Sequence, residues 1–147
     1  MKQACLIIPY YGKWPKYLPI YLESCKNNNW LDVLFFTDIK PTFSYPSNVK
    51  FIDFPLSELE NRVTQLTGIT NYTLPNAYKL CDLRPLYGKI FQEYIKNYQY
   101  WAFGDCDLIY GNLLKFIQED LERNIDIISF NEPRISGSLT LLKNHAA

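Results

Sequence analysis

Six short apolar runs recur along the chain and have the length of buried β-strands. Their residues are mostly aliphatic or aromatic, and polar or turn-forming residues bound each run. The predicted strands cover residues 4–8, 33–37, 49–54, 98–104, 125–130 and 137–142. Because several of them are continuously apolar rather than alternating, we expect both of their faces to be covered.

Segments with helical periodicity lie between these strands, at residues 14–26, 57–68, 77–97 and 113–123. Ser57 and Glu60 have the spacing of a capping box, and Gly68 is placed to end the same helix. The third segment carries an apolar face, but Pro85 must kink or restart it. Strands that alternate with helices predict an α/β fold, with a mostly parallel central sheet flanked by helices.

The size and the charge of the chain narrow its function. Its 147 residues, 48% of them hydrophobic, suit a single domain. Fifteen basic and fifteen acidic side chains give zero formal net charge, so we expect no general attraction to nucleic acid or anionic lipid. Any anion must therefore be bound by a local group of residues.

The sequence shows no sign of export or of membrane insertion. Met1 is followed almost at once by a predicted strand, and no apolar run approaches the span of a bilayer. None of the four cysteines has the C-x-x-C spacing of a zinc site. We therefore expect reduced thiols and a cytoplasmic protein without a transmembrane segment.

Two acidic residues, Asp105 and Asp107, follow the aromatic strand at 98–104 and lie in a turn with a glycine on each side. Carboxylate oxygens are suitable ligands for Mg²⁺ or Mn²⁺, and a metal with open coordination positions also binds a diphosphate. The alternative is that both acids only solvate a turn, because Gly and Asp are common turn residues. The pair is thus a candidate metal site.

Other polar residues follow the ends of predicted strands. Pro9, Tyr10 and Tyr11 come after the first strand, and Asp38 comes after the second. In a doubly wound sheet these ends converge on one crevice, where a nucleotide is expected to bind. The alternatives are a turn or a helix cap for Asp38 and ordinary core or rim packing for one of the tyrosines.

A second polar cluster contains Lys79, Asp82 and Arg84, within about one helical turn. Lys79 and Arg84 would neutralise a diphosphate, while Asp82 accepts a hydrogen bond from a sugar or ribose hydroxyl. A structural salt bridge within the cluster is the alternative. Proximity to Asp105 decides between the two.

Five ordered stretches carry a resemblance to a known family: residues 7–15, 35–38, 78–88, 103–112 and 134–137. Together they resemble a bacterial glycosyltransferase-like family of mostly unassigned activity, and the resemblance covers nearly the whole chain. Its members are similar to A-type glycosyltransferases, which have a Rossmann-like nucleotide-sugar fold with an Asp-x-Asp metal motif.

The resemblance implies an activity, a cofactor and roles for individual residues. Asp105 and Asp107 match the motif that binds the metal and the diphosphate, with Mn²⁺ or Mg²⁺ as the cofactor. Asp38 matches an acid that faces the nucleoside, and Lys79 with Asp82 resembles the donor-side pair. The implied reaction transfers a sugar from a nucleotide diphosphate sugar, UDP-linked by default, to a glycan or a lipid-linked acceptor.

The chain departs from that family in its length. Such enzymes normally continue past the acid motif into an acceptor region, so we expect residues 1–147 to be one nucleotide-sugar-binding domain, truncated after the sixth strand. His145 is then the only late candidate for a further metal ligand. Apolar surface uncovered by truncation would favour a homodimer.

Two other functions stay open. A haloacid-dehalogenase-like phosphatase also has Asp-x-Asp after a strand, with the first acid as nucleophile. In that class the motif usually ends the first strand of the core, whereas three predicted strands precede it here. The second alternative is a donor-binding or interaction module without catalytic activity.

Overall fold

The computed structural model describes residues 2–131 and 134–145 of the chain. Its strands are β1 (Lys2–Pro9), β2 (Leu31–Thr37), β3 (Val49–Asp53), β4 (Tyr98–Gly104), β5 (Ile127–Ser129) and β6 (Leu139–Lys143). Its helices are α1 (Leu18–Cys25), α2 (Leu56–Thr67), the 3₁₀ helix η1 (Ala77–Leu86), α3 (Tyr87–Ile90), α4 (Gln92–Ile95) and α5 (Leu114–Glu122). All six predicted strands are present, and the bounds predicted for β4 are those observed.

The strands form a single sheet in the order β3-β2-β1-β4-β6-β5. β1 to β4 are mutually parallel, whereas β6 runs antiparallel to its neighbours β4 and β5. The prediction of a mostly parallel α/β sheet is therefore confirmed, and this strand order is compatible with a Rossmann-like fold. β1 and β4 lie at the centre, where their carboxyl ends leave the sheet side by side.

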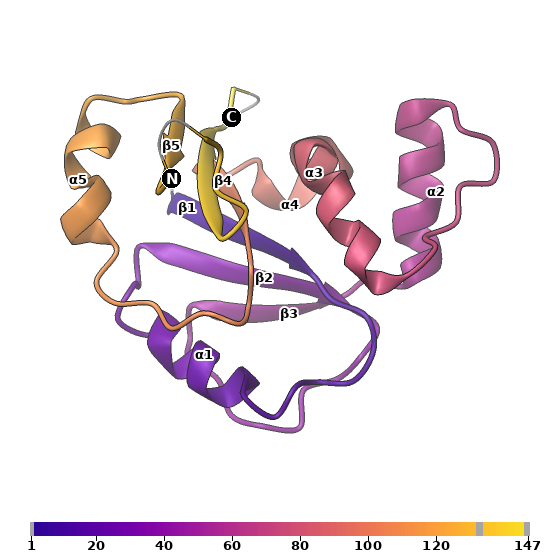
Figure 1. The fold of residues 1–147 in the computed structure, drawn as a ribbon, viewed down its shortest axis with the longest axis horizontal. Coiled ribbons are helices and arrows are strands. Elements are labelled where there is room, and N and C mark those ends of the chain that lie inside the picture. Colours follow the sequence, from indigo (N-terminus) through magenta and orange to yellow (C-terminus); the bar gives the residue numbers. More distant parts are fainter. Residues whose placement is uncertain (1, 132–133, 146–147) are drawn as a thin grey trace.

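Helices cover both faces of the sheet, as Figure 1 shows. On one face, alternate residues of β1 such as Leu6 pack with α1 and α5. On the other face, the intervening residues, such as Ile7, pack with α2, η1, α3 and α4. All seven residues of β2 are buried, which explains its continuous apolar run.

Two predicted helix starts are wrong. α1 begins at Leu18, because Trp14 belongs to the preceding loop and stacks on Tyr10 with ring centroids 4.8 Å apart. α2 begins at Leu56 directly after Pro55, so the predicted capping box does not form. Instead, the Glu60 carboxylate accepts a hydrogen bond from the Leu74 amide at 2.8 Å.

The segment predicted as a kinked helix at 77–97 is broken into η1, α3 and α4. Pro85 lies inside η1, and α3 begins two residues later. Proline lacks the backbone N–H that a regular α-helix needs, which favours this interruption. The apolar face predicted for this segment is largely confirmed. Six of its seven residues, Leu80, Leu83, Tyr87, Ile90, Phe91 and Ile95, are buried, and the seventh, Tyr94, is half-buried.

Gly68 ends α2 in the left-handed conformation, with φ of 73°, as predicted. None of the helices in the part of the chain that the structure describes has the length and apolar character that a membrane crossing requires.

Candidate functional site

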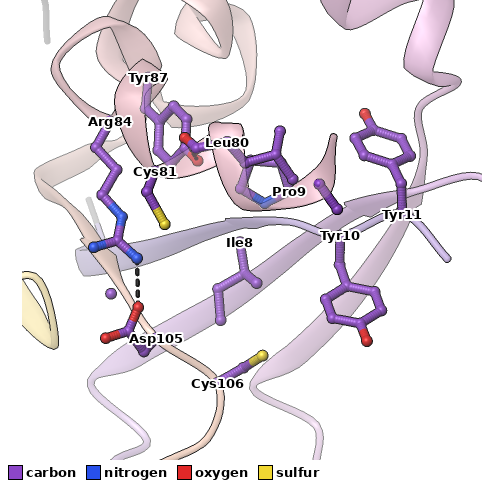
Figure 2. Close-up of a pocket in the computed structure, with 12 residues that line it drawn as sticks. Ile8, Pro9, Tyr10, Tyr11, Leu80, Cys81, Arg84, Tyr87, Asp105 and Cys106 are labelled. Atoms are coloured by element: carbon purple, nitrogen blue, oxygen red, sulfur yellow. Dashed lines mark hydrogen bonds and ion pairs between the residues drawn. The ribbon is translucent and has the colours of Figure 1, made fainter. Parts of the chain in front are cut away.

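A pocket opens where the central strands β1 and β4 end. The register pairs Ile7 with Phe103, so Pro9 and Asp105 leave the sheet next to each other. η1 covers this point, and Figure 2 shows its side chains facing the two strand ends. The lining residues are Ile8, Pro9, Tyr10, Tyr11, Ala77, Leu80, Cys81, Arg84, Tyr87, Gly104, Asp105 and Cys106.

Arg84 and Asp105 form an ion pair across the pocket (Figure 2). The Arg84 Nη1 atom also donates a hydrogen bond to the Gly137 carbonyl at 2.9 Å, and its guanidinium carbon lies 5.8 Å from the centre of the Phe103 ring. The Arg84 side chain is 15% exposed and that of Asp105 is 38% exposed. The carboxylate is thus the more open partner.

Arg84 is a permanent cation, and the charge of Asp105 stabilises its charged form. Burial alone would lower the pKa of Arg84, but the hydrogen bond to Asp105 and its negative charge outweigh burial and raise that pKa. A permanent cation therefore faces the pocket next to a carboxylate.

The backbone of β4 fixes Asp105 in place. Its amide donates a hydrogen bond to the Ser138 carbonyl at 3.1 Å, which ties the strand end to the loop before β6. Gly104 makes this close approach feasible, because a Cβ atom there would lie 2.6 Å from the same carbonyl oxygen. The loop that carries Gly137 is therefore part of the site.

Tyr10 and Tyr11 point to opposite sides of the chain after β1 (Figure 2). The Tyr10 hydroxyl donates to the Lys13 carbonyl at 2.8 Å, and the ring stacks on Trp14. The Tyr11 hydroxyl is buried without a hydrogen-bond partner among the described residues. Burial raises the pKa of Tyr11, and the charges of Asp38 and Glu60 add to this effect.

The structure pairs Lys79 and Asp82 with each other, at 2.9 Å, rather than with Asp105. Both side chains are exposed and neither lines the pocket. In a 3₁₀ helix, residues three apart share a face. Cys81 and Arg84 therefore share one face of η1 toward the pocket, and Tyr87 at the start of α3 continues this row. Lys79 and Asp82 belong to another row.

Asp107 and Asp38 lie outside the pocket lining as well. Asp107 is exposed, and its charge adds to burial in raising the pKa of the Cys106 thiol to about 11. Asp38 is also exposed and lines a separate cavity with Lys40, Phe51 and other residues at the ends of β2 and β3. Tyr11 lines the pocket at the ends of β1 and β4, and the charge of Asp38 in the second cavity raises its pKa.

His145 lies at the other end of the sheet. The amide of its neighbour Asn144 bonds to the Gln99 carbonyl near the start of β4, and His145 Nε2 lies 3.6 Å from Asp126. The length of β4, seven residues at about 3.3 Å each, separates it from Asp105. The structure therefore does not bring His145 to the acid pair.

Residues 6–147 match a protein family described as a family of unknown function, DUF6625. The chain belongs to this family. Its matched region contains all three segments that build the pocket, at the ends of β1 and β4 and along η1. No curated protein and no solved structure matches the chain.

The acid pair offers oxygen ligands only. Within the described parts of this DUF6625 chain, no group of three or more His, Cys, Asp or Glu residues is placed to hold a metal ion. Asp105 and Asp107 could supply two carboxylate ligands of the kind that Mg²⁺ and Mn²⁺ prefer. Such an ion would fit the donor chemistry if phosphate oxygens and water completed its coordination.

The sequence did not mark Cys81, Tyr87 or Gly137 as residues of the candidate site. The first two lie in the row of Arg84, and the third supplies a carbonyl to its guanidinium. A three-residue period from Cys81 through Arg84 to Tyr87 is the sequence signal that would have found the row. The contact of Gly137 is a long-range one that no local pattern encodes.

Proposed function

We propose that the chain is a metal-dependent glycosyltransferase domain that binds a nucleotide diphosphate sugar at the carboxyl ends of β1 and β4. The observation that carries the proposal is the pocket in which a cation, Arg84, faces an acid from the Asp-x-Asp motif. Ligands of parallel α/β sheets bind at this edge, where neighbouring strands lead to different connections. The acceptor in this proposal is a glycan or a lipid-linked sugar.

In the proposed complex, the diphosphate of the donor lies between Arg84 and Asp105. A guanidinium binds phosphate oxygens through two parallel hydrogen bonds, and Arg84 is a permanent cation at the pocket. Asp105 and Asp107 would hold Mn²⁺ or Mg²⁺, which supplies positive charge to the departing diphosphate. UDP is the default nucleotide.

The residues of the chain contribute positioning and charge. Departure of the nucleoside diphosphate leaves negative charge on its terminal phosphate, and Arg84 stabilises that charge inside a partly enclosed pocket. Pro9, Tyr10 and Tyr11 also line the pocket and would contact the donor where β1 ends. The acceptor hydroxyl forms the new bond to the sugar carbon as the bond to the diphosphate breaks, and its proton passes to the departing diphosphate or to water.

The remaining candidate residues keep roles at the border of the pocket. Asp38 would accept a hydrogen bond from the nucleoside, which would have to extend past Tyr11 toward the cavity at the ends of β2 and β3. Lys79 and Asp82 would meet the donor only from the exposed side of η1. Both assignments stay predictions.

A thermal-shift panel tests the binding step. Nucleotide sugars with different bases and sugars are added with and without Mn²⁺, and a ligand of the native state raises the melting temperature. We expect at least one UDP-sugar to do so only with Mn²⁺, and Asp105→Asn to remove the shift. Asp126→Asn is the matched control, because Asp126 is an exposed acid at the other end of the sheet.

Turnover separates the proposed enzyme from the alternatives. A long incubation with the donor found by the panel should release nucleoside diphosphate, because a glycosyltransferase slowly hydrolyses its donor when no acceptor is present. Binding without release would indicate a donor-binding module. Hydrolysis of a generic phosphate ester that depends on Asp105 as nucleophile would indicate a phosphatase.

A further inference from the structure

Arg84 holds the inner acid of the candidate metal site. Its Nη2 atom contacts Asp105 Oδ1, its Nη1 atom bonds to the Gly137 carbonyl, and the guanidinium lies near the Phe103 ring. Three separate segments, η1, the end of β4 and the loop before β6, therefore fix this side chain. It is nearly buried, with 15% of its surface exposed.

This contact creates a conflict for a metal ion. Asp105 is the only one of the two motif acids that lines the pocket, and its charge is already balanced by Arg84. A divalent cation that approached Asp105 would meet the positive charge of Arg84 in a partly enclosed site, where repulsion between like charges is weakly screened. In the free protein, metal and arginine compete for one carboxylate.

A diphosphate resolves the conflict. It brings negative charge and several acceptor oxygens, and it is a good bidentate partner for a guanidinium. Arg84 can then exchange the carboxylate for phosphate, which leaves Asp105 free for the metal. The chemistry of the pocket thus favours the arrival of both ligands over the arrival of the metal alone.

We infer that Arg84 masks Asp105 in the free protein, so that metal and nucleoside diphosphate bind cooperatively. The inference rests on the proposed function, because it concerns the same donor site. Cooperative binding is reciprocal: the factor by which UDP tightens Mn²⁺ is the factor by which Mn²⁺ tightens UDP. The masking itself concerns Mn²⁺ alone and is measured without any nucleotide.

The test is a Mn²⁺ titration followed by the electron paramagnetic resonance signal of the free ion, with and without UDP. In the wild-type protein we expect weak binding of Mn²⁺ alone and an affinity about 10-fold higher with UDP, within the usual range of coupling. In Arg84→Gln we expect Mn²⁺ alone to bind about 10-fold more tightly than to wild type, and UDP to add little.

Arg62→Gln is the matched control. Arg62 is also a nearly buried arginine, 21% exposed. It lies in α2 and bonds to Glu58 of the same helix at 2.7 Å and to Glu93 of α4 at 2.6 Å. Its replacement should leave every Mn²⁺ affinity unchanged. Arg84→Lys, which keeps the charge but not the two-pronged geometry, should lie between wild type and Arg84→Gln and serves if the glutamine variant does not fold.

The outcomes separate the inference from the function. If Mn²⁺ alone binds equally to wild type and to both Arg84 variants, masking is wrong, even where Mn²⁺-dependent binding of UDP upholds the proposed function. If an Arg84 variant gains Mn²⁺ affinity but the wild type does not bind UDP with or without Mn²⁺, masking stands and the proposed function is wrong. If Mn²⁺ binds to none of the proteins, even with UDP present, both are overturned.

Discussion

Two acidic side chains lie at opposite ends of the sheet, and their surroundings differ. Asp32, at the amino end of β2, is 7% exposed and accepts hydrogen bonds from Tyr98 at 2.5 Å and from Lys50 at 2.8 Å. Asp105, at the carboxyl end of β4, is 38% exposed and faces Arg84 across a pocket. Each acid has a basic partner, but only Asp105 is open to a ligand.

The difference indicates what each acid does. Lys50 and Tyr98 come from β3 and β4, so Asp32 joins three strands of the sheet. Asp105 is held mainly by a cation that a phosphate can attract away. A charged group that links several strands stabilises the fold, whereas a charged group with a replaceable partner at the ligand-binding edge serves binding.

Among the variants that test this comparison, Asp32→Ala should lose the most stability. It leaves the Lys50 ammonium and the Tyr98 hydroxyl without their shared acceptor, and we expect a loss of about 3 kcal/mol in the free energy of unfolding. Asp105→Ala should cost less, about 1 kcal/mol, because Asp105 is partly solvated and Arg84 keeps its hydrogen bond to the Gly137 carbonyl. Denaturation in urea measures both, and an equal loss in the two variants would contradict the distinction.

Gly104→Ala should cause the next largest loss in the free energy of unfolding. Its Cβ atom would lie 2.6 Å from the Ser138 carbonyl oxygen, so the end of β4 and the loop before β6 must move apart. We expect a loss of about 2 kcal/mol and weaker UDP binding, because the same loop holds Arg84 through Gly137. Gly111→Ala is the control, since nothing lies within 4 Å of its Cβ position.

The stability of Tyr98→Phe, measured at several pH values, tests the role of Asp32 further. The substitution removes the Tyr98 hydroxyl that donates a hydrogen bond to Asp32, and it should lower the free energy of unfolding by about 1.5 kcal/mol at neutral pH. Burial, together with the hydrogen bond to Asp32, raises the pKa of Tyr98 above its ordinary value of 10.0. The neutral hydroxyl is therefore favoured in the folded state.

This shift fixes the sign of the pH dependence. The contribution of Tyr98 is complete below pH 10, where the hydroxyl is neutral in both states, and it falls as the pH rises above 10, where only the unfolded chain ionises. Denaturation curves of wild type and Tyr98→Phe should therefore converge in alkali. A difference that stays constant from pH 8 to pH 11 would contradict this account.

Local patterns in the sequence predicted the sheet well. The apolar run of β2 and the aromatic run of β4 can be packed only inside a sheet covered on both faces, and both strands form where expected. Pro85 was expected to interrupt its helix, and it does. These features depend on a few neighbouring residues and on burial.

The features that local patterns do not specify depend on distant contacts. Glu60 matches a capping box in sequence, but the loop after α2 returns and presents the Leu74 amide to it. Lys79 and Arg84 are equivalent by charge, and only the 3₁₀ geometry of η1 turns Arg84 toward Asp105. The Gly137 carbonyl is 53 residues from Arg84 in sequence. No local pattern specifies these partners.

The most direct test of the central claim is a crystal structure with UDP and Mn²⁺, with the metal located from its anomalous signal. We predict a manganese peak at coordination distance from the Asp105 carboxylate, about 2.1 Å, with the diphosphate next to Arg84. A diphosphate bound away from the ends of β1 and β4, or a manganese ion that does not contact Asp105, would contradict the account.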